Sequence, residues 1–137
     1  MPTIALIDDD PDIIEANRML LEANGYYVVS ARTVDEAINL VHEHHPDLLL
    51  LDVMMQEADD GFYLANRFRR SGYDFPIIML TSLSRSVGMH LGESATVPIQ
   101  DFLEKPVSPA VLLEAIDTQL RGRHASGAPA GRHATDG

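Results

Sequence analysis

The sequence predicts a single α/β domain built on an open parallel sheet of five strands, with helices on both faces. Five short apolar runs alternate with segments of helical periodicity, which is the pattern of repeated strand–helix units. The apolar runs are continuous rather than alternating, as in parallel strands that are covered on both faces. The 137 residues are enough for one such domain.

The first half of the chain supplies three of the predicted strands and two helices. Strands are expected over residues 4–7, 27–29 and 48–51. Asp10 followed by Pro11 is typical of a helix N-cap and first helical residue, and Asn24-Gly25 predicts the end of that helix. Thr33 and Glu36 have the spacing of a capping box, which predicts the start of the second helix.

The second half continues the alternation less regularly. Strands are expected over residues 77–80 and 99–103. Before them, Gly61, Leu64, Ala65 and Phe68 form a helical stripe, and the helix is expected to stop near Gly72. The segment 83–95 predicts a weak or irregular fourth helix, because Gly88 and Gly92 each cost about 1 kcal/mol in a helix. Ser108-Pro109 then predicts the start of a last helix, which carries Leu112 and Ile116 on its apolar face.

Composition and charge narrow the possible functions. We expect residues 1–120 to form the domain and residues 121–137 a flexible tail, with no output domain. The formal net charge is −11, so we expect no direct binding of nucleic acid, which requires clustered cations. The chain has no cysteine and therefore no thiolate metal site. It also has no apolar stretch long enough for a membrane span and no signal peptide, which makes the cytoplasm the default location.

Polar side chains follow four of the predicted strands at their carboxyl ends. Asp8 and Asp9 follow the first strand, Asp52 the third, Thr81 the fourth and Lys105 the fifth. If the strand order is 2-1-3-4-5, these strands are neighbours and their ends converge on one crevice. Carboxylates packed together repel one another unless a cation joins them, and Mg²⁺ is a hard ion that prefers oxygen ligands. The pattern therefore predicts a magnesium site at this edge.

These residues resemble the receiver domain of two-component response regulators. The resemblance covers residues 3 to about 120 and rests on the segments Leu6-Ile7-Asp8-Asp9-Asp10, Leu50-Leu51-Asp52-Val53-Met54-Met55, Ile78-Met79-Leu80-Thr81-Ser82 and Phe102-Leu103-Glu104-Lys105-Pro106. It implies a flavodoxin-like fold with the strand order 2-1-3-4-5. It also implies a signalling switch rather than an enzyme, in which Asp52 accepts a phosphoryl group from a histidine kinase.

The resemblance further implies how the metal is held. Asp9, Asp52 and the main-chain carbonyl of Met54 would ligate Mg²⁺, and Asp8 would act through a bound water. Mg²⁺ would then offset charge on the phosphoryl oxygens during an in-line transfer.

The resemblance also implies roles for five residues around the phosphoryl group. Lys105 would place a positive charge beside the phosphoryl group, and Thr81 would turn inward to hydrogen-bond a phosphoryl oxygen. Phe102 would follow this movement as a purely steric signal. Met54 and Leu83 occupy the positions that tune the lifetime of the phosphorylated form; both are apolar, so we expect slow self-dephosphorylation.

Two segments depart from the family pattern. Gln56 stands where receivers commonly have proline, and Gly61 comes one residue late, so one residue is inserted within 56–60. Thr96-Val97-Pro98 replaces the usual Ala-Gly-Ala before the fifth strand, which puts the partner surface around the fourth helix in doubt.

The main hypothesis is a stand-alone phosphoacceptor, and two alternatives are kept beside it. Its expected partners are a sensor histidine kinase or phosphotransfer protein and a downstream protein target, with the chain a monomer or a phosphorylation-dependent dimer. One alternative is a pseudo-receiver that binds partners without phosphorylation. The other is a Mg²⁺-dependent phosphohydrolase of the haloacid dehalogenase type, which is disfavoured because Asp52-Val53-Met54 lacks that family's second aspartate.

Overall fold

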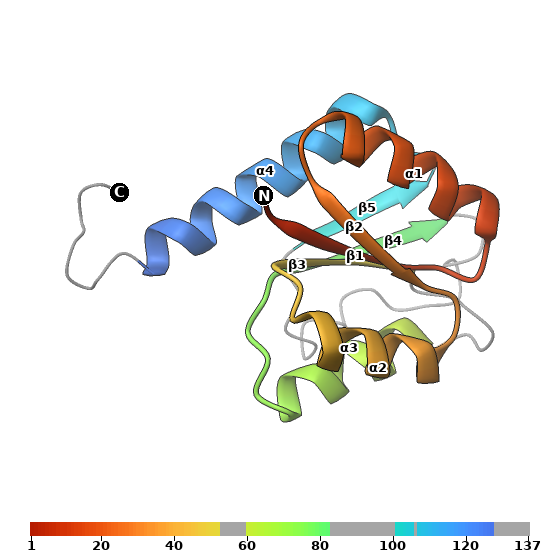
Figure 1. The fold of residues 1–137 in the computed structure, drawn as a ribbon, viewed down its shortest axis with the longest axis vertical. Coiled ribbons are helices and arrows are strands. Elements are labelled where there is room, and N and C mark those ends of the chain that lie inside the picture. Colours follow the sequence, from red (N-terminus) through yellow and green to blue (C-terminus); the bar gives the residue numbers. More distant parts are fainter. Residues whose placement is uncertain (53–59, 83–100, 106, 128–137) are drawn as a thin grey trace.

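The computed structural model describes residues 1–52, 60–82, 101–105 and 107–127. In this part of the chain a central sheet is covered by helices on both faces (Figure 1). The strands are β1 (Thr3–Ile7), β2 (Tyr27–Ala31), β3 (Leu48–Asp52), β4 (Ile77–Ser82) and β5 (Asp101–Lys105). The helices are α1 (Pro11–Ala23), α2 (Val34–His44), α3 (Asp60–Arg70) and α4 (Pro109–Gly127).

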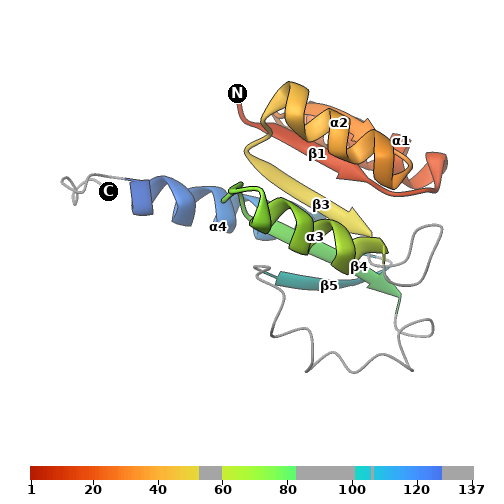
Figure 2. The same ribbon diagram turned by 90° about the horizontal axis from the view of Figure 1, so that it is seen from below.

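The sheet has the predicted class and order. Its strands run β2-β1-β3-β4-β5, and every pairing between neighbours is parallel (Figure 2). The central strand β3 contributes four leucines, Leu48–Leu51, each no more than 1% exposed. Ile7 is paired with Leu51, so the residues that follow these two lie at the same edge of the sheet. Those next residues are Asp8 and Asp52.

The side chains of alternate strand residues pack into two separate cores. One core contains Ile7, Leu49 and Leu51 and is covered by helices α2 and α3, with Phe68 among its buried side chains. The other contains Leu6 and Leu50 and is covered by α1 and α4. This division follows from the two-residue period of a strand, which turns successive side chains to opposite faces. Burial on both faces explains why the strands are continuous apolar runs.

The helix starts agree with the predicted caps, with one difference in detail. The Asp10 side chain accepts a hydrogen bond from Asp12 N at 2.9 Å and caps α1. The Thr33 hydroxyl accepts one from Glu36 N at 3.1 Å and caps α2. A capping box would return the Glu36 carboxylate to the Thr33 N–H. Here it accepts instead from Arg32 N at 3.0 Å, one residue earlier.

Several described elements continue past the ends that the sequence predicted. The fifth strand continues to Lys105, two residues past its predicted end at residue 103, because the polar residues Glu104 and Lys105 pair with Thr81 and Ser82 of β4 and continue the ladder. The last helix runs to Gly127, so the expected tail from residue 121 begins as helix; Arg121 pairs with Asp117 one turn earlier at 3.0 Å.

Three predicted features lie outside the described residues: the helix at 83–95, the inserted residue within 56–60 apart from Asp60, and the tail from residue 128. Among the helices that are described, none combines the length and the apolar character that crossing a membrane requires.

The phenol of Tyr26 supplies a pH-dependent contribution to stability. Tyr26 packs against the α1/α4 core, and this burial, together with the Asp117 carboxylate, raises the pKa of Tyr26 above its ordinary value of 10.0. The unfolded chain therefore loses the phenol proton at lower pH than the folded chain does. The contribution is complete below pH 10.0 and is lost as pH rises through the folded pKa.

We expect Tyr26→Phe to remove this dependence. As pH rises above the ordinary phenol pKa of about 10, the free energy of unfolding of the wild type should fall relative to that of Tyr26→Phe. Urea unfolding of both proteins at matched pH values on either side of it measures this. A constant difference across the range would contradict the assignment.

Candidate metal centre at the carboxyl edge of the sheet

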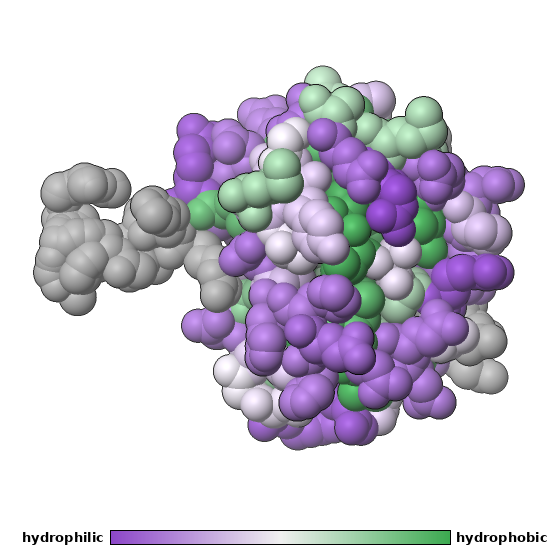
Figure 3. Space-filling view, viewed as in Figure 1, coloured by the Kyte–Doolittle hydropathy of each residue, from purple (hydrophilic) through white to green (hydrophobic). Residues whose placement is uncertain are grey.

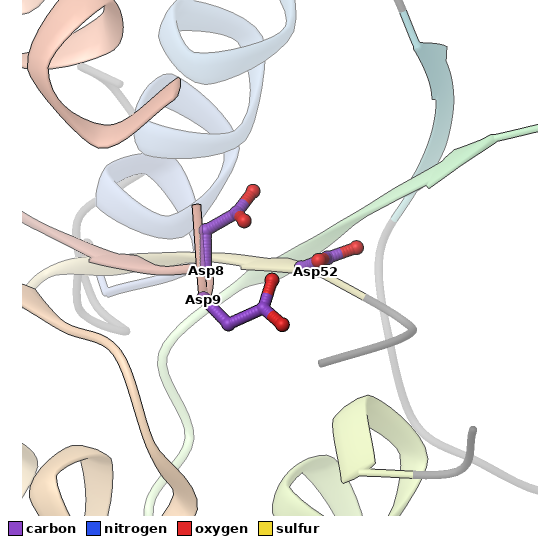
Figure 4. A group of neighbouring side chains, drawn as sticks. All are labelled: Asp8, Asp9 and Asp52. Atoms are coloured by element: carbon purple, nitrogen blue, oxygen red, sulfur yellow. The ribbon is translucent and has the colours of Figure 1, made fainter. Parts of the chain in front are cut away.

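Three carboxylates gather where strands β1 and β3 end. Asp8 and Asp9 follow β1, and Asp52 is the last residue of β3 (Figure 4). One carboxylate oxygen from each lies within 4.8 Å of the others, and this is the only such acidic or histidine group found in the described part of the chain. Asp8 and Asp52 are each 4% exposed, whereas Asp9 is half-buried. The structure thus brings together three acids from two strands.

Lys105 bridges two of these carboxylates from the far edge of the sheet. Its Nζ lies 3.0 Å from Asp8 Oδ2 and 3.3 Å from Asp52 Oδ1. The Lys105 side chain is 19% exposed, so water screens these contacts only in part. Ion pairs in such a setting are stronger than those at the surface, and removal of either partner leaves a buried charge uncompensated.

Asp8 is held at both of its carboxylate oxygens. Oδ1 accepts a hydrogen bond from the main-chain N–H of Asp10 at 3.0 Å, and Oδ2 accepts the Lys105 ammonium. The N–H of Asp8 itself donates to the carbonyl of Ala31 at 3.2 Å. The sequence indicated Asp10 only as a helix cap. Asp10 also donates its main-chain N–H to Asp8, and a main-chain contact of this kind cannot be predicted from the residue type.

The four side chains suit a divalent cation that prefers oxygen. Three carboxylates and one ammonium leave two negative charges in excess, which one divalent ion would neutralise. All the donor atoms are carboxylate oxygens, the ligands of hard ions such as Mg²⁺. A cavity of about 310 Å³ shares Asp9 with the cluster and is otherwise lined by Arg32, Thr33 and Glu36.

The remaining predicted site residues are placed less completely. Thr81 pairs with Glu104, and Phe102 pairs with Met79, so both lie in the strands where they were expected. Their side chains, and the whole of Met54, are outside the described residues. The predicted residues that the structure brings together are therefore Asp8, Asp9, Asp52 and Lys105.

Comparison with known proteins identifies what this arrangement resembles. The sequence model of the family described as response regulator receiver domain matches residues 4–117. The response regulator GtcR of Aneurinibacillus migulanus is 35% identical over 119 residues, which cover 87% of this chain and 48% of that protein. The transcriptional regulatory protein AfsQ1 of Streptomyces coelicolor is 35% identical over 88% of this chain and 52% of its own length. The chain thus spans about half the length of the curated relatives it matches.

Solved structures give the same result for the fold. A CheY-like receiver domain protein from Methanospirillum hungatei superposes with a TM-score of 0.80 at 28% identity, covering 93% of this chain and 99% of that one. The BeF3-activated N-terminal receiver domain of Klebsiella pneumoniae RstA superposes with a TM-score of 0.75 at 31% identity, covering 87% and 98%.

The geometry predicts that Mg²⁺ stabilises the fold through Asp9. At a free Mg²⁺ concentration ten times the dissociation constant, binding should add about 1.4 kcal/mol to the free energy of unfolding. Thermal unfolding followed by circular dichroism, with and without Mg²⁺, measures this gain. Asp9→Asn should lose most of it. Asp10→Asn is the matched control, because asparagine also caps a helix and Asp10 lies outside the cluster. Equal responses in the two variants would contradict the site.

Proposed function

Because the chain belongs to the family of response regulator receiver domains, we propose that Asp52 accepts a phosphoryl group from a histidine kinase and that this switches a protein-interaction surface. The observation that carries the proposal is the contact of Lys105 Nζ with both Asp8 and Asp52. A buried carboxylate beside a positive charge, at the sheet edge where α/β folds bind ligands, supports the proposed role of Asp52 as the nucleophile.

The proposed reaction is a transfer from donor to carboxylate. An oxygen of Asp52 attacks phosphorus and forms an acyl phosphate. The bond between phosphorus and the donor atom breaks, and its electron pair leaves with the donor. Lys105, already 3.3 Å from Asp52 Oδ1, is placed to hydrogen-bond an oxygen of the transferred group. A preorganised cation of this kind offsets the negative charge that gathers as the new bond forms.

Mg²⁺ is the proposed cofactor. Asp9 and Asp52 would hold it together with the carbonyl of Met54, and it would supply positive charge to the phosphoryl oxygens when bound. Asp8 would act through a bound water. The two hydrogen bonds already accepted by the Asp8 carboxylate support that indirect role, because each of its oxygens has one lone pair fewer to offer a metal ion.

Thr81 and Phe102 are the proposed switch residues. Asp52 pairs with Leu80, so Thr81 is the next residue of β4 beyond the phosphoacceptor's partner. From that register its hydroxyl would donate a hydrogen bond to a phosphoryl oxygen after transfer. Phe102 lies on the adjacent strand β5 and would move with it. The phosphoryl group would thereby bias the population of two arrangements of this region.

The proposed partners of the receiver are a sensor histidine kinase or phosphotransfer protein on the donor side and a protein target on the output side. The acidic charge of the chain supports our prediction that these 137 residues do not bind nucleic acid directly. That prediction concerns these residues alone, since relatives named transcriptional regulators are about twice as long.

Incubation with Mg²⁺ and acetyl phosphate tests the proposal. We expect the intact mass to rise by one phosphoryl group, and Asp52→Asn to abolish the gain because it removes the nucleophile. Asp35→Asn, which changes an exposed acid of α2, should behave like wild type. A pseudo-receiver would gain no mass. A phosphohydrolase would consume many equivalents of donor and cleave unrelated phosphomonoesters.

The phosphorylated form should persist well beyond seconds once the donor is removed. The positions that tune its lifetime, Met54 and Leu83, carry apolar side chains that cannot orient an attacking water. The decay of the phosphorylated mass in the presence of Mg²⁺ measures this. Complete loss within seconds would show that another group supplies the water.

A further inference from the structure

Arg32 is the first residue after strand β2, and the register of the sheet places it beside the carboxylate cluster. Ile7 pairs with Ala31, and the N–H of Asp8 donates to the Ala31 carbonyl at 3.2 Å. The residues that follow β1 and β2 therefore start side by side at the carboxyl edge. Arg32 and Asp9 both line the cavity of about 310 Å³. One cavity thus connects a cation at the end of β2 with the acids of the metal centre.

The guanidinium of Arg32 forms no ion pair within the described part of the chain. Lys105 contacts two carboxylates, and Arg18 and Arg121 pair with acids on their own helices. Glu36, the acid one turn along from Arg32, accepts a hydrogen bond from the main-chain N–H of Arg32 at 3.0 Å rather than from its side chain. Arg32 is exposed, so its charged group can meet a ligand that enters the cavity.

Negative charge opposes the approach of a phosphodonor to this edge of the sheet. The three carboxylates and one ammonium of the centre leave two negative charges in excess, and the chain as a whole carries −11. Lys105 lies on the β5 side of the centre and contacts its acids, whereas Arg32 lies on the β2 side. A cation in a cleft beside the acids raises the local concentration of an anionic ligand.

The lining of the cavity suits phosphoryl oxygens. The planar fork of Arg32 matches the geometry of phosphate, and the Thr33 hydroxyl, which accepts from Glu36 N at 3.1 Å, keeps its own proton to donate. Asp9 belongs to the metal centre, and Glu36 Oε1 faces the Arg32 N–H. Figure 3 shows mainly hydrophilic side chains at the right of the view, where Figure 1 shows the turn from β2 into α2. The entrance is therefore polar, as a charged ligand requires.

We propose that this cavity is the entry site for an anionic phosphodonor and that Arg32 binds the phosphoryl oxygens of the donor before transfer. The inference rests on the proposed function, because the group bound here is the one that Asp52 would accept. Arg32 contributes binding and orientation, and no covalent bond forms or breaks at its side chain. It thereby favours donors that carry more negative charge.

The initial rate of phosphorylation by acetyl phosphate, at low donor concentration and with Mg²⁺, tests the proposal on the full chain. Arg32→Ala should lower this rate about tenfold at low ionic strength, and Arg32→Lys should be intermediate because it keeps the charge without the fork. The difference should shrink as salt is raised to about 0.5 M, since salt screens exposed charges. Arg121→Ala is the matched control, because it removes the same charge from an exposed position on α4 and should match wild type.

The Mg²⁺ affinity of the same variants separates capture of the donor from damage to the metal centre. Arg32→Ala keeps the main-chain N–H that binds Glu36, so the start of α2 should be preserved. Loss of a positive charge beside Asp9 should leave Mg²⁺ binding, followed by amide chemical shifts, as tight as in wild type or tighter. An unchanged phosphorylation rate would overturn the proposal. So would a slower rate accompanied by weaker Mg²⁺ binding, which would make Arg32 a structural residue of the metal centre.

Binding of inorganic phosphate keeps the test independent of phosphoryl transfer. With Mg²⁺ present, phosphate should shift the amide resonances of Thr33 and Glu36 in wild type and in Arg121→Ala, and only at several-fold higher concentration in Arg32→Ala. A wild type that gains no phosphoryl mass from acetyl phosphate would refute the proposed function, and phosphate binding would then decide this inference alone. Equal phosphate affinity in Arg32→Ala and Arg121→Ala, or wild-type resonances that phosphate does not move, would overturn it in either case.

Discussion

Repulsion among the carboxylates of Asp8, Asp9 and Asp52 is the constraint on which the rest of this structure depends. A parallel sheet brings the carboxyl ends of its strands to one edge, so acids that follow separate strands are held close together there. Lys105 offsets part of this charge by contacting two of the three groups. The negative charge that remains suits the edge to a divalent cation, on which the proposed phosphoryl transfer depends.

The apolar sheet supplies the rigidity that holds the repelling groups in place. Strand β3 is buried on both faces, and burial of each leucine contributes about 2 kcal/mol. Two cores, one on each face, fix the register between β1 and β3 and so fix the separation of Asp8 from Asp52. Side chains at the ends of such strands cannot move apart without disturbing this packing. The packing of the interior therefore holds together, at the edge, carboxylates that repel one another.

Two long cationic side chains contact the two kinds of edge of this parallel sheet, the carboxyl edge and the lateral edge. Lys105 reaches across the carboxyl edge and contacts acids from β1 and β3. Arg18 reaches over the lateral edge and contacts main-chain and hydroxyl acceptors of β2. The chemistry differs in a consistent way: a compact ammonium sits between two carboxylates, whereas a planar guanidinium spans two neighbouring acceptors. At both edges, one long cationic side chain contacts acceptor oxygens that the strand geometry brings close together.

The sequence by itself determined which segments form strands and helices, where helices α1 and α2 begin, and which acids end the strands. Those features are local, since they depend on apolar period and on capping side chains such as Asp10 and Thr33. The predicted ends of β5 and α4 came too early, because the residues that continue both elements have no apolar pattern. Only the tertiary structure decided that Lys105 contacts Asp8 across 97 positions, that Asp10 N–H orients Asp8, and that Arg18 covers β2. Contacts of this kind depend on strand register and main-chain direction, which no residue type encodes.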